Sequence, residues 1–181
     1  MYYIPYYYPY YSVPPGYYDS RQYLQYAYPY DLRSKQGVHD YGPQPYVVNI
    51  NKATKQNQNY RTTLWTGKHL QVTLMSINPG EDIGLEIHPT VDQFLRIEQG
   101  QGIVKMGKAK NQLNFQRKVF DDSAIMVPAG TWHNVVNTGN EPLKLYSIYA
   151  PPQHAKGTVH KTKADAMKEE HLKKSLSPKE R

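Results

Sequence analysis

Short runs of alternating apolar and polar residues fill the middle of the chain, from about residue 46 to residue 150. The run HLQVTLMSI places Val72 and Leu74 on one face and Met75 and Ile77 on the other, as in a strand with neither face fully wet. Turn residues such as Asn, Pro and Gly separate the runs, and nothing between them has the pattern of a long amphipathic helix. Many short strands at this spacing predict an all-β sandwich or barrel.

Composition divides the 181-residue chain into three predicted parts, which are a tail over 1–45, the β-domain over 46–152 and a basic, partly helical tail over 153–181. The first 30 residues hold 13 of the 18 Tyr, mixed with Pro. Such a segment cannot build a core, because its aliphatic residues are few and Pro favours extended chain. We expect a disordered low-complexity tail; the alternative is a self-association segment that resembles the Tyr-rich tails of bacterial spore-coat proteins.

The C-terminal part predicts a short helix. Thr162 and Asp165 have the spacing of a capping box, and Pro178 prevents continuation. The expected apolar face consists of Ala164, Met167, Leu172 and Leu176. His154 and His160 precede this helix, and we expect them in a solvated loop, with a position over the barrel mouth as the alternative.

The formal net charge of +7 raises nucleic acid as a partner. From residue 151 onward, however, eight Lys and Arg face four Asp and Glu, so over half of the excess lies in the C-terminal tail. No basic stripe with interleaved aromatic residues is present, and no stretch approaches the roughly 18 consecutive apolar residues of a membrane span. We therefore expect no nucleic-acid or membrane partner and a cytoplasmic location, with a spore coat or other surface assembly as the alternative. Cysteine is absent, which excludes thiolate chemistry.

The stretch GEDIGLEIHPTVDQFLRIEQG resembles the first signature motif of the cupin superfamily, G(X)5HXH(X)3,4E(X)6G. Gly80 and Gly100 take the two glycine positions. Glu86 falls on the first His, His88 on the second His and Gln93 on the Glu, and every spacing holds.

A second stretch, DSAIMVPAGTWHNVVN, resembles the second cupin motif, G(X)5PXG(X)2H(X)3N. Asp122 stands in place of the first glycine, and Pro128, Gly130, His133 and Asn137 match in order. The resemblance implies a double-stranded β-helix, or jelly-roll, barrel over the middle of the chain. More narrowly, the sequence is similar to small bacterial cupins of unassigned function, some of which are named mannose-6-phosphate isomerase.

The resemblance also implies a mononuclear divalent metal site at Glu86, His88, Gln93 and His133. A strand period of two places Glu86 and His88 on one face, where they can share an ion. Relative to the usual three His and one Glu, an imidazole is exchanged for a carboxylate and a carboxylate for an amide, and the ion can be Mn, Fe, Ni or Zn. Gln93 has an alternative role as a hydrogen-bonding partner of His88, and His133 as a core residue.

Three functions remain open, and the residues do not decide whether the protein is an enzyme. The first is a metal-dependent protein that acts on or binds a small molecule, with Glu86 as metal ligand and catalytic general base. The second is a metal-free acid/base catalyst resembling the sugar isomerase and epimerase cupins. The third is a structural or binding barrel whose Tyr-rich tail mediates assembly. Homodimerisation is also expected, since it would cover exposed edge strands.

Overall fold

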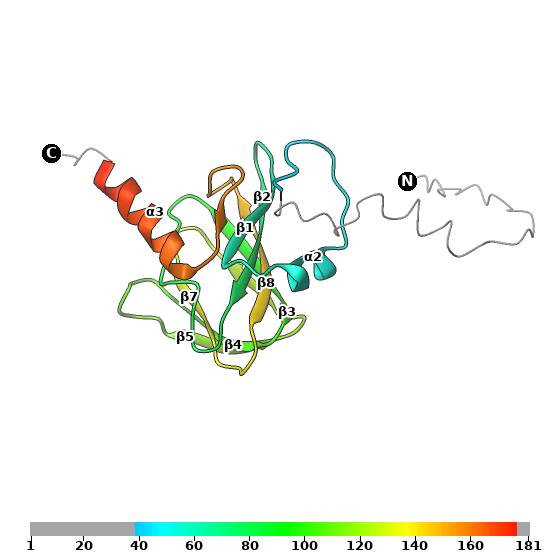
Figure 1. The fold of residues 1–181 in the computed structure, drawn as a ribbon. Coiled ribbons are helices and arrows are strands. Elements are labelled where there is room, and N and C mark those ends of the chain that lie inside the picture. The colour runs from blue at the N-terminus through cyan, green and yellow to red at the C-terminus, as the bar shows by residue number, and fades with distance from the viewer. Residues whose placement is uncertain (1–38, 177–181) are drawn as a thin grey trace, which may run out of the picture. The chain divides into compact units, whose positions relative to one another are not determined.

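The structure, a computed structural model, describes residues 39–176 (Figure 1). The elements follow one another as α2 (Ile50–Gln56), β1 (Arg61–Thr66), β2 (Gln71–Ile77), β3 (Asp92–Gln99), β4 (Gln101–Gly107), β5 (Phe115–Phe120), β6 (Ala124–Val127), β7 (Trp132–Asn137), β8 (Leu143–Ala150), β9 (Val159–His160) and α3 (Lys163–Leu176). The Tyr/Pro-rich segment up to residue 38 lies outside the described residues, so the tail and its role stay predictions.

The strands form two antiparallel sheets that enclose one core. The larger sheet has the order β6-β3-β8-β2-β1-β9 and the smaller one β5-β4-β7, so the chain passes repeatedly from one sheet to the other (Figure 1). The main core cluster draws Ile77 and Leu95 from the first sheet and Val104 and Val135 from the second. This arrangement confirms the predicted jelly-roll barrel.

The inner face of the larger sheet is apolar at one end and polar at the other. In the pairing of β2 with β8, Ile77 lies opposite Leu143, whereas Thr73 lies opposite Ser147. Alternation along the strands then brings Gln71, Gln93 and Tyr149 to the same polar end. All of these polar residues are buried, so the barrel holds hydrogen-bonding groups at one end of its interior.

The outer face of the larger sheet is covered by α2. Ala53 of this helix packs with Leu64 and Leu74, and Val72 and Tyr146 lie against the same cluster. The alternating run in β2 is therefore buried on both faces, as the sequence pattern predicts. Tyr146 belongs to this outer cluster and so does not line the barrel interior.

Helix α3 begins with the predicted capping box. The backbone N–H of Thr162 donates to the carboxylate of Asp165, whose own N–H donates to the hydroxyl of Thr162. The predicted apolar face is wrong, because the core contact is made by Ala166, which is 4% exposed, while Met167 is 51% exposed. Polar pairs hold the helix on that side instead, among them Lys163 with Asp82 of the β2–β3 connection. Among the described residues, no helix is long and apolar enough to cross a membrane.

Candidate metal centre

The two motif segments meet through a backbone bridge between Glu86 and His133. The N–H of each residue donates to the carbonyl oxygen of the other, at 3.0 Å in both directions. Glu86 lies in the connection between β2 and β3, which runs antiparallel beside β7 at this point. Directly opposed residues in an antiparallel pair project their side chains to the same side. The bridge therefore sets the Glu86 carboxylate beside the His133 imidazole.

A tight turn after β6 joins His88 to the same arrangement. The N–H of Thr131 donates to the carbonyl oxygen of Pro128, and the N–H of Gly130 donates to the carbonyl oxygen of His88 at 2.8 Å. Gly130 adopts a φ of 74°, which glycine accepts without steric cost. The Pro-Ala-Gly turn of the second motif thus anchors the backbone of the first motif.

Glu86, His88 and His133 form a compact cluster of possible metal ligands. One donor atom from each lies within 4.8 Å of the others. Oε1 of Glu86 is 3.4 Å from Nε2 of His88 and 3.4 Å from Nε2 of His133. His133 is fully buried and His88 is 6% exposed, while the Glu86 side chain keeps 16% of its surface exposed. The structure therefore brings together three of the four predicted site residues in one cluster.

Glu86 is held in its ionised form. Burial by itself raises the pKa of this carboxyl group, but the adjacent imidazoles of His133 and His88 and the positive charge of Arg61 outweigh burial, and the pKa lies below its ordinary value. The Arg61 guanidinium is 3.9 Å from Oε2 of Glu86 and its side chain is 2% exposed. The site thus offers a carboxylate to a cation.

The tautomer of His133 suits a metal ligand. Its Nδ1 lies 2.9 Å from the carbonyl oxygen of Thr131, which can only accept, so Nδ1 carries the proton in the neutral ring. The lone pair of Nε2 then points to the Glu86 carboxylate. Orientation of a histidine by a backbone carbonyl is typical of metal-binding imidazoles.

Gln93 enters the barrel from β3 at the polar end. Its Nε2 donates to the hydroxyl of Ser147 at 2.9 Å, and the residue is 3% exposed. In the β3–β8 pairing Gln93 lies opposite Tyr149, whose ring packs edge-on against His88 at a centroid distance of 5.6 Å. The Ser147 contact fixes the amide so that its oxygen remains available.

The hydrogen bonding of the donor atoms gives a further reason to expect a metal ion at this site. The buried side-chain atoms that have no hydrogen-bond partner among residues 39–176 include the four donor atoms that the motifs imply: Oε1 of Glu86, Nε2 of His88, Oε1 of Gln93 and Nε2 of His133. Buried polar atoms without partners are costly and uncommon in folded proteins. A cation placed in the cluster would satisfy the donor atoms of Glu86, His88 and His133, and Gln93 offers its oxygen at the same polar end of the barrel.

Asn137, the last residue of the second motif, has a structural role. Its amide nitrogen donates to the carbonyl oxygens of Ile77 and Glu141, and its amide oxygen accepts from the N–H of Gly139. The side chain closes the β7–β8 turn and ties it to the end of β2. No group of Asn137 is left for a ligand.

The expectation of a solvated loop for His154 and His160 is wrong. The His154 ring packs edge-on against Tyr149 at 5.1 Å, and its backbone N–H donates to the side chain of Gln71. His160 is 7% exposed, and its Nε2 lies 2.6 Å from the Glu169 carboxylate of α3. His154 therefore lies beside the polar end of the barrel, as the alternative predicted, while His160 holds the C-terminal helix.

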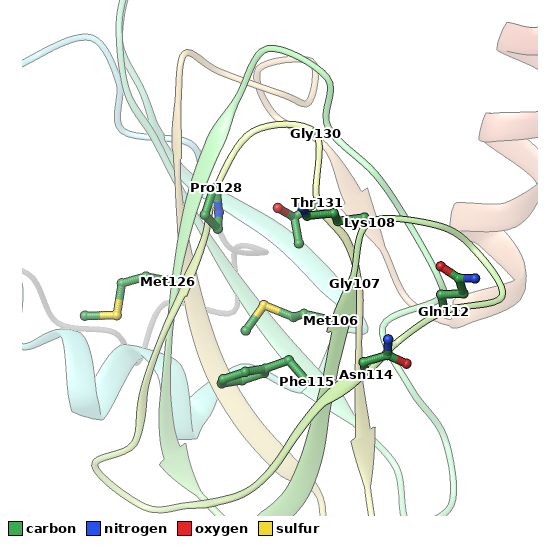
Figure 2. Close-up of a pocket in the computed structure, with 10 residues that line it drawn as sticks. All are labelled: Met106, Gly107, Lys108, Gln112, Asn114, Phe115, Met126, Pro128, Gly130 and Thr131. Carbon is green, nitrogen blue, oxygen red and sulfur yellow. The ribbon is translucent and has the colours of Figure 1, made fainter.

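A separate hollow of about 500 Å³ lies between β4, β5 and β6, next to the Pro-Ala-Gly turn (Figure 2). Met106 and Phe115, paired across β4 and β5, stand beside one another in its wall. Its lining residues are Met106, Gly107, Lys108, Gln112, Asn114, Phe115, Met126, Pro128, Gly130 and Thr131. None of the candidate ligand residues lines this hollow, so it is distinct from the Glu86 cluster.

Comparison with known proteins identifies the family of this chain. The profile of the cupin domain family matches residues 73–149. The uncharacterized protein YrkC of Bacillus subtilis (strain 168) is 80% identical over 128 residues, which cover 71% of this chain and 69% of YrkC. The uncharacterized protein L612 of Acanthamoeba polyphaga mimivirus is 44% identical over 117 residues, covering 64% of this chain and 71% of L612.

One solved crystal structure is also similar to this chain. The crystal structure of BH2720 from Bacillus halodurans superposes with a TM-score of 0.72 at 69% sequence identity, over 72% of this chain and 99% of that chain. The chain belongs to the cupin superfamily.

Proposed function

We propose that this cupin binds one divalent transition-metal ion through Glu86, His88, Gln93 and His133 and acts on or binds a small molecule inside the barrel. The observation that carries the proposal is the set of four buried donor atoms without partners. They come from the two cupin motifs, and no hydrogen bond within the described residues accounts for their burial.

Two of the proposed ligand residues have a side-chain hydrogen bond that keeps them in position. Thr131 orients His133, and Ser147 orients Gln93. Two imidazoles with carboxylate and amide oxygens suit Mn, Fe, Ni or Zn. Such an ion supplies Lewis-acid polarisation of a bound oxygen or lowers the pKa of a bound water.

The low pKa of Glu86 favours its role as an anionic ligand over its role as a general base. A general base works best when its pKa lies near the working pH, and the pKa of Glu86 lies far below neutrality. The same argument weighs against the metal-free acid/base catalyst, because that mechanism needs Glu86 to take up a proton readily.

The test is the metal content of the full chain, purified without an affinity tag from cells supplied with Mn, Fe, Co, Ni and Zn. Elemental mass spectrometry on the wild type, on His133→Ala and on His69→Ala measures ions per chain. His69 is exposed and serves as the matched control. We expect close to one ion per chain in the wild type and the control, and loss of the ion in His133→Ala.

Metal-free wild-type protein that is folded would overturn the proposal and favour a structural barrel. A truncation that begins at residue 39 then tests the structural hypothesis directly. If the Tyr-rich tail mediates assembly, the truncated chain loses self-association in analytical ultracentrifugation.

A further inference from the structure

The barrel contains a buried arginine with no hydrogen bond. The Arg61 side chain is 2% exposed, and its Nε has no partner among the described residues. Its ion pair with Glu86, at 3.9 Å, is longer than a hydrogen bond. Its other neighbours are the ring of Tyr60, with the guanidinium carbon 5.5 Å from the ring centroid, and, at longer range, Tyr149 and Glu170 of α3. A guanidinium carries five N–H donors, and the buried Nε–H of this one has no partner within residues 39–176.

Burying a guanidinium whose Nε–H has no partner in the described part of the chain costs free energy. This cost indicates that the guanidinium binds an anionic ligand. A buried charge is tolerated when it is paired and hydrogen-bonded, and the distance to Glu86 provides pairing without the hydrogen bonds. Strand β1 fixes the position of Arg61, since its backbone pairs with Met75 on one side and with His160 on the other. The side chain is therefore enclosed by the fold and cannot swing into solvent.

A second donor faces the same space. Tyr149 is fully buried, and its hydroxyl makes no hydrogen bond of normal geometry with a described residue. Its ring contacts His88, and a tyrosine hydroxyl is a proton donor at neutral pH. The buried hydroxyl of Thr73, on the adjacent strand β2, also lacks a partner among these residues.

We propose that Arg61 and Tyr149 form an oxyanion-binding site beside the Glu86 cluster and that the small molecule taken by the barrel carries a carboxylate. The inference rests on the proposed function, and charge supports it. With a divalent ion bound, the buried site would carry two net positive charges, because the charges of the Glu86 carboxylate and the Arg61 guanidinium cancel. An anionic ligand therefore lowers the electrostatic cost of burying this charge.

The donor set suits a carboxylate. The Arg61 guanidinium, 3.9 Å from Oε2 of Glu86, is a permanent cation in the barrel interior. A single planar guanidinium matches a planar carboxylate through two parallel hydrogen bonds.

The test is calorimetric titration of the metal-loaded full chain with oxalate, with inorganic phosphate and with oxamide, the neutral analogue of oxalate. Arg61→Met removes the charge at similar length, and Tyr149→Phe removes one hydroxyl and keeps the ring. Arg117→Met on exposed β5 and Tyr146→Phe on the outer face are the matched controls. Metal content is measured on every sample.

We expect Arg61→Met to weaken oxalate binding about 10- to 100-fold and Tyr149→Phe by about 3- to 10-fold, as for lost hydrogen bonds to a charged group. Both variants keep their metal, the controls bind like the wild type, and oxamide binding changes little. Tyr149→Phe carries the test alone if Arg61→Met does not fold.

Oxalate affinity within twofold of the wild type in both variants would overturn the inference while leaving the metal site standing, and so would phosphate binding tighter than oxalate. A wild type without metal would instead overturn the proposed function. The same titrations on that metal-free chain then decide the anion site alone, with absence of oxalate binding counting against it.

Discussion

Glu86 and His133 exchange two backbone hydrogen bonds of 3.0 Å in an isolated bridge between the β2–β3 connection and β7. These residues are far apart in the sequence, and each belongs to a different cupin motif. Because main-chain bonds hold the pair, the positions of the two side chains do not depend on their attraction for one another. The site is therefore organised before any ligand arrives.

Metal binding is expected to stabilise the protein against heat. An ion that binds only the folded state, at 100 times its dissociation constant, adds about 2.7 kcal/mol. We expect the midpoint of thermal unfolding to rise with the bound metal and to fall after treatment with a chelator. His133→Ala should show no response to either reagent, and an equal response in that variant would contradict the ligand assignment.

Gln93 is expected to tune metal affinity. Gln93→Glu replaces a weak amide ligand with a carboxylate and should bind the metal more tightly, whereas Gln93→Ala should weaken binding about 10- to 100-fold. Competition with a fluorescent chelator measures both affinities, and Gln116→Glu on exposed β5 controls for added negative charge. Unchanged affinity in both Gln93 variants would remove this residue from the site.

Asp40 is expected to contribute stability that acid removes. Its carboxylate is 4% exposed and accepts hydrogen bonds from Gly42, Thr66 and Gly157. Burial raises its pKa, but these donors outweigh burial and lower the pKa from 3.8. The contribution is therefore complete above about pH 4, the pKa of an unfolded Asp, and is lost as the pH falls through the lower folded value.

The free energy of unfolding at pH 7 should accordingly be lower in Asp40→Asn by about 1–3 kcal/mol, which is the cost of leaving buried hydrogen-bond partners unsatisfied. Urea unfolding at pH 7 and at pH 3 measures the difference. The gap between wild type and variant should narrow at the lower pH. A gap that stays constant would show that the charge of Asp40 makes no contribution.

Asp122 adopts a left-handed backbone with φ of 67°, at the place where the cupin motif has glycine. Its exposed carboxylate pairs with Arg96. Asp122→Gly and Asp122→Ala both lose this pair, so their difference isolates the backbone. We expect the alanine variant to be less stable than the glycine variant by about 1–2 kcal/mol in urea unfolding. Equal stability of the two variants would argue against strain at this position.

The cluster residues Glu86, His88 and His133 could be predicted from sequence because their signals are local. Two of them are two positions apart on an extended segment, and the third follows a Pro-Ala-Gly turn. Arg61 and Tyr149 could not be predicted in their roles in this way. They come from strands near opposite ends of the barrel segment, and no local spacing reveals that both end beside Glu86.

The C-terminal helix likewise has one feature that could be predicted from sequence and one that could not. Its start could be predicted, since Thr162 and Asp165 interact within one turn. The buried face could not, because docking against the barrel selects Ala166 over the larger Met167. The sequence by itself determined the strands, the turns and the ligand types, which depend on alternation and short-range geometry. Only the tertiary structure decided which buried groups share the barrel interior, because strand pairing between distant segments sets those contacts.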